Sequence, residues 1–378
     1  MSQRDVYVIG VGMVPFGRFP EIPAAVHGAR AGAQALDDAG VDWQDISTMY
    51  CGASMTGGFV ASRVGHLLGL NESEQVTVDN ASASGSSAFR QAVLAVGEGR
   101  TDVALAVGCG KMDRAMFFGA GPDPLEQRIA VADAQLTAAV RFALIAQRRM
   151  HDEGLDEEVF HRITVKSHRH ASLNPNAQYR KEVTLEQVLE SRLIADPIHL
   201  LECTPTGDGG AAAVVATREV AERLGRHPLV RVMASQFRSA PETDHLFYEY
   251  ELTKRTASDA YEDAGIGPSD LDLCQVHDAF STEELEYYEA LGVCDPGEGG
   301  RLVMDGDVEL GGRIPFNTDG GLVSRGHPLG PTGLAQIWET TLQLRGQAGP
   351  RQIDGARLGL AQMIGAGGVC VIHILGRD

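Results

Sequence analysis

The same pattern of a helix end, a short link and a strand occurs twice in this chain, and it constrains the fold more than any other feature. Residues 35–46 contain Ala-Leu-Asp-Asp-Ala-Gly-Val followed by Asp-Ile, and residues 260–271 contain Ala-Tyr-Glu-Asp-Ala-Gly-Ile followed by Asp-Leu. Each helix is expected to end at its glycine, Gly40 or Gly265, because glycine adopts the left-handed conformation that terminates helices. The 378 residues are therefore predicted to contain two copies of one α/β unit.

Strands and helices alternate along both copies, which favours an α/β protein with a buried sheet. The segment at 83–99 is rich in Ala, Ser and Gly and nearly uncharged, so it is expected to be a helix packed on all sides, between two sheets. Its Ser-Gly start corresponds to the Gly-Pro-Thr-Gly start at residue 330 of the second copy. Strands are predicted at 6–12, 47–51, 74–80, 102–110 and 357–365, and a helix is predicted to end at residue 39.

We expect an N-terminal half at residues 1–225 and a C-terminal half at 226–378. The first half carries an insertion at about 112–200, which includes an amphipathic helix predicted at 136–151.

The net charge of −19, from 32 basic and 51 acidic side chains, argues against a protein that coats nucleic acid or anionic membranes, because such surfaces are basic. No apolar run reaches the roughly 18 residues of a membrane helix, and the first residues do not resemble a signal peptide. The six cysteines are scattered without metal-ligand spacing, so we expect reduced thiols, no metal site and a cytoplasmic protein.

One basic segment stands out in this acidic chain. Between residues 159 and 181 there is no Asp or Glu, and five cations are accompanied by three histidines. One interpretation is a seat for phosphate groups. The other is a solvated face that pairs with the acidic residues at 152–158. The candidate phosphate contacts are Arg162, Lys166, His168, Arg169, Arg180 and Lys181.

The first chemically interesting loop is Asp-Asn-Ala-Ser-Ala-Ser-Gly at residues 79–85, where a predicted strand runs into a helix. Ser82 or Ser84 would lie near unpaired N–H groups, where an anionic nucleophile gains stabilisation and its own N–H can serve an oxyanion hole. The alternative is that Ser84 is only a helix cap.

Three further loops follow predicted strands, where ligands collect in α/β sheets. His277 and Asp278 end a strand, with Ser281 as a predicted cap of the next helix and Glu284 as its capping-box partner. His327 lies between glycines and a proline that fix a tight loop, where an imidazole can act as a general base or oxyanion donor. At Gly365 the backbone N–H could face a ligand oxygen.

Together these motifs resemble the thiolase family, over essentially the whole chain. The resemblance is to the branch of sterol-carrier-protein-type and archaeal thiolases and thiolase-like lipid-transfer proteins. It is carried by Lys-Ser-His-Arg-His-Ala-Ser-Leu-Asn-Pro-Asn-Ala-Gln from residue 166, Glu-Cys-Thr-Pro-Thr-Gly-Asp-Gly-Gly from 202, Val-His-Asp-Ala-Phe from 276 and Gly-Gly-Leu-Val-Ser-Arg-Gly-His-Pro-Leu-Gly-Pro-Thr-Gly from 320.

The resemblance implies a five-layered α-β-α-β-α fold of two repeated halves, with a loop domain inserted in the first half and a tight homodimer. It implies an acyl-CoA substrate with coenzyme A phosphates on the basic insertion, an oxyanion hole from the N–H groups of Ser82 and Gly365, and a small zinc-ribbon/OB-fold partner protein. Ser82 matches the nucleophilic cysteine of thiolases, His327 matches the Gly-His-Pro histidine, and His277 begins the motif that reads Asn-Glu-Ala-Phe in many thiolases.

The sequence departs from the family at three positions where thiolases use cysteine, which are Ser82, Ala279 and Met363. A thiolate is accessible near neutral pH, whereas a serine hydroxyl needs a strong local base. Three functions stay open at this point. The first is acyl transfer through Ser82, making or breaking a carbon–carbon bond next to a coenzyme A thioester. The second is retro-aldol cleavage of a β-hydroxyacyl-CoA by His277, His327 and Asp278. The third is a non-catalytic acyl-CoA-binding or scaffold protein.

Overall fold

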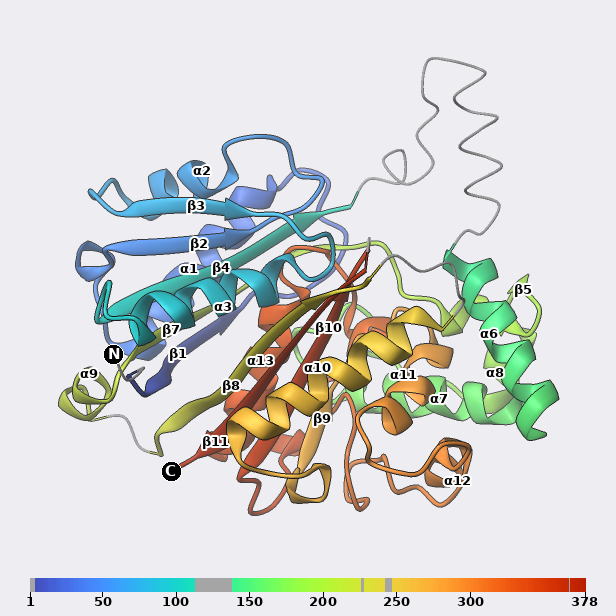
Figure 1. The fold of residues 1–378 in the computed structure, drawn as a ribbon. Helices are drawn as coiled ribbons and strands as arrows, with labels where there is room; N and C mark the ends of the chain where they lie inside the picture. The colour runs from blue at the N-terminus through green and yellow to red at the C-terminus, as the bar shows by residue number, and fades with distance from the viewer. Residues whose placement is uncertain (1–3, 113–137, 226–227, 242–246, 367) are drawn as a thin grey trace.

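The two sequence copies form two halves, and the strands of both halves join in one continuous sheet (Figure 1). The computed structural model describes residues 4–112, 138–225, 228–241, 247–366 and 368–378. Within these residues, nine strands form a mixed sheet in the order β3-β2-β4-β7-β1-β8-β11-β10-β9. The strands are β1 (Val6–Met13), β2 (Thr48–Gly52), β3 (Glu74–Val78), β4 (Val103–Lys111), β7 (Asp208–Thr217), β8 (Val230–Ser239), β9 (Leu273–Gln275), β10 (Leu358–Gly365) and β11 (Val369–Arg377).

Strand directions repeat between the halves. In the first half β2 runs parallel to β3 and β4, while β7 is antiparallel to both β4 and β1. In the second half β10 is parallel to β9, while β11 is antiparallel to both β10 and β8. The counterpart of β3 is reduced to a single parallel bridge between Cys274 and Phe316. The halves join at β1 and β8 through the pairs Tyr7–Arg231 and Val8–Val230.

The helices complete five layers, as expected from the sequence. Helix α1 (Ala24–Ala39) covers the outer face of β1, β7 and β4, and α10 (Tyr248–Ala264) covers the outer face of β8 and β11. Helices α3 (Ser84–Gly97) and α13 (Thr332–Arg345) lie between the halves and contact strands of both. Strands β1 and β7 are buried along their whole length, because helices cover both of their faces.

The two central helices meet through glycine. A Cβ atom on Gly85 would lie 2.5 Å from the carbonyl oxygen of Gly330, and a Cβ on Gly330 would overlap the carbonyl oxygen of Cys109. Only a residue without a side chain permits backbones to approach this closely. The starts of α3 and α13 are thereby held against each other.

The insertion packs on the opposite half from the one that carries it in sequence. Its helices are α6 (Ala138–Glu153), α7 (Glu158–Ser172) and α8 (Leu185–Glu190), with a two-stranded ribbon of β5 (Leu193–Ala195) and β6 (Ile198–His199). In Figure 1 these helices lie beside α11 (Ser281–Ala290) and α12 (Gly299–Met304), and α7 contacts both. Two further α-helices of the described residues are α2 (Val60–Leu68) and α9 (Arg218–Arg223).

Most predicted elements are confirmed within one to three residues. Helices α1 and α10 end at Gly40 and Gly265, both in the left-handed conformation. The helix predicted at 136–151 is found as α6, although residues 136 and 137 lie outside the described residues. The boundary between halves at residues 225 and 226 stays a prediction. None of the helices described is both long and apolar enough to cross a membrane.

Candidate active site

Ser82 and His327 meet in the centre of the molecule, one from each half. Ser82 lies on the turn between β3 and α3, and His327 lies on the loop before α13. The Oγ atom of Ser82 is 3.0 Å from Nε2 of His327, and both side chains are buried. A hydroxyl in hydrogen-bond contact with an imidazole is the arrangement found in activated nucleophiles and in proton relays.

The ring of His327 is oriented by Thr332 in the first turn of α13. The Thr332 hydroxyl donates its proton to the carbonyl oxygen of Pro328 at 2.7 Å and lies 2.9 Å from Nδ1 of His327. Since that hydroxyl has one proton, it can only accept from Nδ1–H. Nε2 then presents a lone pair to Ser82. Burial, helped by the charges of His277 and Arg325, lowers the pKa of His327 well below its usual value, so the imidazole is neutral.

A second histidine, His277, lies beside the first. The two rings are 5.3 Å apart between centroids and almost perpendicular. Nδ1 of His277 is 3.2 Å from Oε1 of Glu283, and its Nε2 is buried without a hydrogen-bond partner among the described residues. The motif after β9 therefore supplies one more imidazole nitrogen for a bound molecule.

Gly365 and the two empty cysteine positions lie around Ser82. A Cβ on Gly365 would overlap the carbonyl oxygen of Asn80 and lie 3.1 Å from the Cβ of Ala83, so the end of β10 touches the Ser82 turn. Ala279 and Met363 pack in an apolar cluster with Ala83, Leu322 and Val371. Where thiolases place two further thiols, this chain thus has an apolar wall.

The backbone of the Ser82 turn is strained and is held by hydroxyl groups. Ala81 has φ 49°, a left-handed conformation that an L-residue adopts at a cost. The Oγ atom of Ser84 donates to the carbonyl oxygen of Ala81 at 2.6 Å and accepts from the N–H of Asn80 at 2.9 Å. Ser84 therefore braces the turn that precedes α3, and it is not the helix cap considered from the sequence, since the cap position is Ala83.

Asp278 is buried and joins two of the loops that carry the site residues. Its Oδ1 accepts from the N–H of Leu322 at 2.6 Å, which ties the loop after β9 to the turn before His327. Within the described residues, its carboxylate makes no hydrogen bond or ion pair with the side chains of Ser82, His277 or His327. Burial, with the charge of Glu284, raises the pKa of Asp278 well above its usual value. Its other oxygen, Oδ2, is buried without a hydrogen-bond partner among the described residues, so the catalytic role expected for Asp278 stays a prediction.

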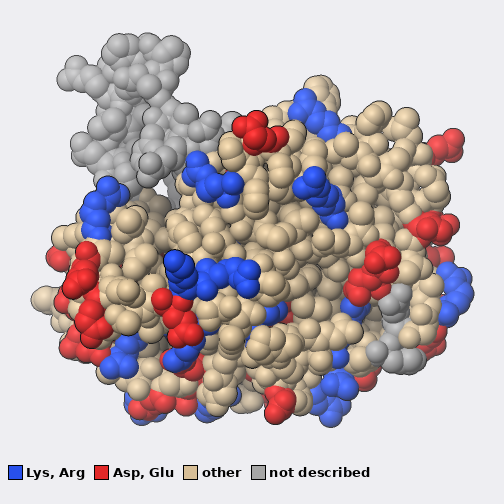
Figure 2. Space-filling view, turned by 180° about the vertical axis from the view of Figure 1, so that it is seen from behind, with Lys and Arg blue, Asp and Glu red and all other residues tan. Residues whose placement is uncertain are grey.

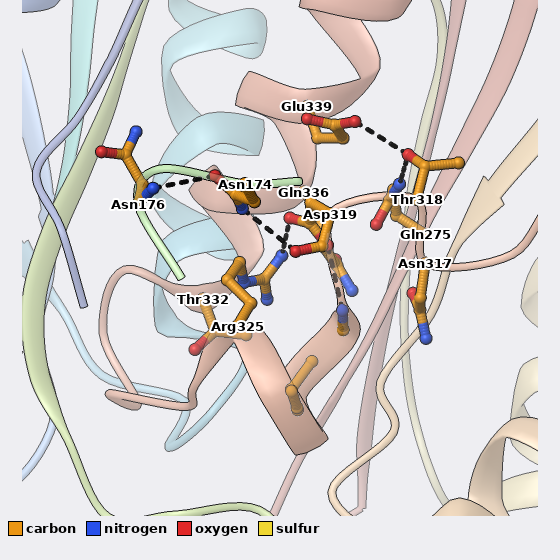
Figure 3. Close-up of polar contacts among 12 residues, drawn as sticks. Asn174, Asn176, Gln275, Asn317, Thr318, Asp319, Arg325, Thr332, Gln336 and Glu339 are labelled. Carbon is orange, nitrogen blue, oxygen red and sulfur yellow. Dashed lines mark hydrogen bonds and ion pairs between the residues drawn. The ribbon is translucent and has the colours of Figure 1, made fainter. Parts of the chain in front are cut away.

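A buried ion pair shapes the loop that carries His327. Arg325 and Asp319 are fully buried, with Nη1 2.5 Å from Oδ2. Figure 3 shows this pair together with Asn174, whose Nδ2 donates to the Asp319 carbonyl oxygen, and Thr318, whose hydroxyl donates to Glu339 of α13 at 2.9 Å. The insertion and α13 therefore both fasten the histidine loop.

The capping expectation for α11 needs a correction. Glu283, and not Glu284, accepts from the N–H of Phe280 at the helix start, at 3.1 Å. Ser281 does not cap the helix and instead donates to Glu202 at 3.0 Å. Glu284 contacts Nζ of Lys166 in a buried ion pair.

The structure does not gather the six basic-segment residues into one surface. Lys166 and His168 are buried, which corrects the expectation that these two side chains contact phosphates; Lys166 binds Glu284, and His168 stacks on Tyr179. Arg162 pairs with Glu158 at 2.6 Å, as the alternative interpretation proposed, and Arg169 pairs with Glu309.

Arg180 and Lys181 are exposed, and no ion pair involves them within the described ranges. On the face drawn in Figure 2, Lys and Arg side chains are likewise scattered, several of them directly beside Asp or Glu.

All six cysteines are free thiols. In the part of the chain that the structure describes, no group of three or more His, Cys, Asp or Glu side chains could hold a metal ion.

Sequence reasoning missed Thr332 and Glu283. Thr332 lies five residues after His327 within the Gly-Pro-Thr-Gly helix start, so a hydroxyl at that spacing was the available signal. Glu283 was visible in Ser-Thr-Glu-Glu, but the sequence did not show which glutamate turns toward the loop.

Two family models match the chain in sequence order. The thiolase N-terminal domain matches residues 6–219, and the thiolase C-terminal domain-like model matches residues 238–377. Acetyl-CoA acetyltransferase of Methanothermobacter thermautotrophicus is 36% identical over 99% of this chain and 100% of that protein. Sterol carrier protein 2 of Gallus gallus is 35% identical over 99% of this chain and 72% of that protein.

Solved structures have the same fold. The structure titled "Ltp2-ChsH2(DUF35) aldolase" matches 100% of this chain and 99% of that chain, with a TM-score of 0.84 and 27% identity. Human mitochondrial 3-ketoacyl-CoA thiolase in complex with CoA matches 99% of this chain and 98% of that chain, with a TM-score of 0.73 and 18% identity, which shows the fold alone. The chain therefore belongs to the thiolase family, among relatives of the sterol carrier protein 2 and archaeal acetyl-CoA acetyltransferase type.

Proposed function

We propose that this protein cleaves the bond between the α and β carbons of a β-hydroxyacyl-CoA by a retro-aldol reaction, without a covalent intermediate. The proposal rests on the three positions that the family resemblance matches to thiols, which are Ser82, Ala279 and Met363 in this chain. Ser82 is hydrogen-bonded to a neutral imidazole, and Ala279 and Met363 belong to an apolar cluster. Thiolytic cleavage needs a thiolate and a second acid/base, whereas a retro-aldol needs one base and a group that stabilises an enolate.

The residues can be assigned to the steps of that reaction. Nε2 of His327, directly or through the Ser82 hydroxyl, takes the proton of the β-hydroxyl, and the β carbon becomes a carbonyl. The electron pair of the broken bond moves into the thioester and forms an enolate, whose oxygen is stabilised by His277. The α carbon then takes the proton. The products are an aldehyde or ketone and a shortened acyl-CoA, and no water or oxidant is consumed.

The substrate would bind with its thioester near Ser82 and His277. Arg180 and Lys181 are the members of the basic segment that are free to contact the coenzyme A phosphates, since they are exposed on the insertion. Gly365, at the end of β10, would present its N–H beside the N–H of Ser82.

A partner protein is part of this proposal. The aldolase to which this chain is similar at 27% identity is titled as an Ltp2-ChsH2(DUF35) assembly. We propose that this protein likewise works with a small zinc-ribbon/OB-fold partner and as a homodimer.

The second candidate is acyl transfer through Ser82. It is favoured by the contact of 3.0 Å between Ser82 and a histidine whose lone pair faces the hydroxyl, which is a nucleophile and base pair. The resulting serine ester would be a poor donor to the thiol of coenzyme A, because an oxygen ester is more stable than a thioester.

Product analysis decides between these functions. The protein, with and without a zinc-ribbon partner, is incubated with β-hydroxyacyl-CoA or with β-ketoacyl-CoA plus coenzyme A. The proposal expects an aldehyde or ketone from the hydroxy substrate and no mass increase on Ser82. An acyl adduct on Ser82 would establish acyl transfer. Binding of both substrates without any product would leave the scaffold function.

A further inference from the structure

Glu283 is a buried carboxylate that the proposed mechanism does not use, although it lies against the site. Its Oε2 accepts from the N–H of Phe280 at 3.1 Å. Its Oε1 is 3.2 Å from Nδ1 of His277 and 3.5 Å from the hydroxyl of Tyr287. Each oxygen therefore has a fixed partner, and the one that faces His277 is on the side of the reacting groups.

The surroundings of Glu283 disfavour a second negative charge. Glu249 from α10 and Glu286 from its own helix are near it, and the cation that faces the group is Arg141 from α6, which binds Glu249. Tyr248 and Tyr287 are further titratable neighbours among the described residues. Burial raises the pKa of Glu283, against the opposing effect of His277. A carboxyl in such a place retains a proton or shares one.

The two histidines then differ in which nitrogen bears hydrogen. Thr332 keeps the proton of His327 on Nδ1, so Nε2 of His327 has a lone pair. For His277, a protonated Glu283 donates to Nδ1 and leaves the hydrogen on Nε2. An ionised Glu283 beside an imidazolium also leaves a hydrogen on Nε2. The pair of Glu283 and His277 can hold its one shared proton in either of these two forms. In both forms, Nε2 of His277 bears a hydrogen.

We infer that Glu283 and His277 share one proton, and that Glu283 thereby keeps Nε2 of His277 a hydrogen-bond donor while Nε2 of the adjacent His327 is an acceptor. Glu283 is a positioning residue that acts through His277. The inference deepens the proposed function and rests on it for the enolate oxygen, which would receive the Nε2–H. The buried, unpartnered Nε2 of His277 is the atom left open for that oxygen.

Glu283→Gln separates the shared proton from a merely structural role. The glutamine oxygen must accept from the N–H of Phe280, so its amide N–H₂ faces Nδ1 of His277 and holds the neutral tautomer with hydrogen on Nε2. The shared proton is absent from this variant, but the hydrogen-bond donor on Nε2 of His277 stays. In the wild type, loss of the shared proton at alkaline pH removes the donor, so kcat/KM falls there.

The kinetic test is the pH profile of kcat/KM for β-hydroxyacyl-CoA cleavage. We expect Glu283→Gln to abolish the alkaline limb and to lower kcat at neutral pH about 10-fold, because a neutral donor is weaker than a charged one. Glu286→Gln is the matched control. Burial raises the pKa of Glu286 to about 8, so its carboxyl is mostly neutral at pH 7, and the variant should keep the wild-type kcat at that pH and still show an alkaline limb. An unchanged alkaline limb in Glu283→Gln would overturn the inference.

Imidazole ¹⁵N NMR tests the dyad without any turnover. Protein labelled in histidine is titrated, and the His277 signals are assigned by their loss in His277→Gln. We expect Nε2 of His277 to bear hydrogen at pH 7 and to lose it at alkaline pH in the wild type, but to retain it throughout in Glu283→Gln. An Nε2 without hydrogen at pH 7 in the wild type would refute the shared proton. If the NMR result holds and no acyl-CoA is cleaved, the proposed function fails and the dyad stands.

Discussion

The two halves place their site loops at equivalent positions but hold them by different forces. In the first half, no buried charge among the described residues bonds the Ser82 turn: Ser84 bonds Asn80 and Ala81, and the carboxylate that accepts from the N–H of Ala81, Asp79, is exposed. In the second half, the His327 loop is fixed by the buried pair of Arg325 and Asp319. Each loop also has one non-glycine residue with φ 49°, Ala81 in the first half and Asn317 in the second.

This difference shows that two halves with the same architecture can supply different chemical groups to one site. The first half contributes a single small hydroxyl beside the start of α3, and little charge is needed to hold it. The second half contributes both imidazoles, and these must stay in defined protonation states. Buried charges and their partners are therefore concentrated around them, and the ion pair of Arg325 with Asp319 is one of these.

The largest expected effect is on stability, from breaking the charged scaffold. Asp319→Asn leaves Arg325 buried without a counter-charge and should lower the free energy of unfolding by about 3–5 kcal/mol. Ser84→Ala in the first half removes two neutral hydrogen bonds and should cost less, about 1–3 kcal/mol. Urea unfolding of both variants measures the difference. Equal losses would show that the two loops are held alike.

The next effect is on catalysis and tests the unequal shares of the two halves. His327→Gln removes the base and should lower kcat for retro-aldol cleavage about 10²–10⁴-fold. Ser82→Ala removes only a relay and should have the smaller effect if no ester forms. Steady-state kinetics with folded protein, checked by unchanged melting temperatures, decides this. A Ser82→Ala variant that is as inactive as His327→Gln would instead indicate covalent chemistry.

A smaller loss of turnover is expected from the residue that orients His327. Thr332→Val removes the acceptor of Nδ1–H and leaves that buried donor unsatisfied, at a cost of about 1–3 kcal/mol. The ring then populates the other tautomer, and kcat should fall about 10–100-fold. Thr332→Ser keeps a hydroxyl at the same position and should restore most of the activity. If valine and serine behave alike, the hydroxyl does not set the tautomer.

The smallest effect concerns the two left-handed residues. Ala81→Gly relieves a conformation that costs an L-residue about 1–2 kcal/mol, but glycine adds about 0.5–1 kcal/mol of chain entropy to the unfolded state. We expect a net stabilisation below about 1 kcal/mol by thermal unfolding.

Asn317→Gly is the contrasting variant in the second half. It should destabilise the protein, because Asn317 donates to Glu284 at 2.8 Å and accepts from the N–H of Val276. A marked destabilisation by Ala81→Gly would show that Ala81 is not strained.

The repeat and the helix-ending glycines predicted two copies of one α/β unit, because these are local signals, and the family resemblance implied the five layers and a common site for Ser82 and His327. The sequence did not predict which charged residues are buried or which partners they contact. Lys166 and Glu284 are 118 residues apart, and their mutual burial depends on how α7 packs against α11. A basic segment looks the same in sequence whether its cations face solvent or a buried glutamate, so Lys166 and His168 were misplaced. Thr332 was missed for the same reason, since its role depends on which ring nitrogen it meets.

The close approach of Gly85 to Gly330 limits how far the Ser82 turn and the His327 loop can move relative to each other. Because α3 and α13 touch through backbone atoms, the turn with Ser82 and the loop with His327 have no compressible side chain between their supports. The two loops should therefore move as one rigid body. The distance between Oγ of Ser82 and Nε2 of His327 should then stay the same for every substrate. A bulkier acyl chain cannot be admitted by spreading them. Selection among substrates must instead come from residues outside these two loops, and swapping the insertion between relatives should alter chain-length preference while the chemistry stays the same.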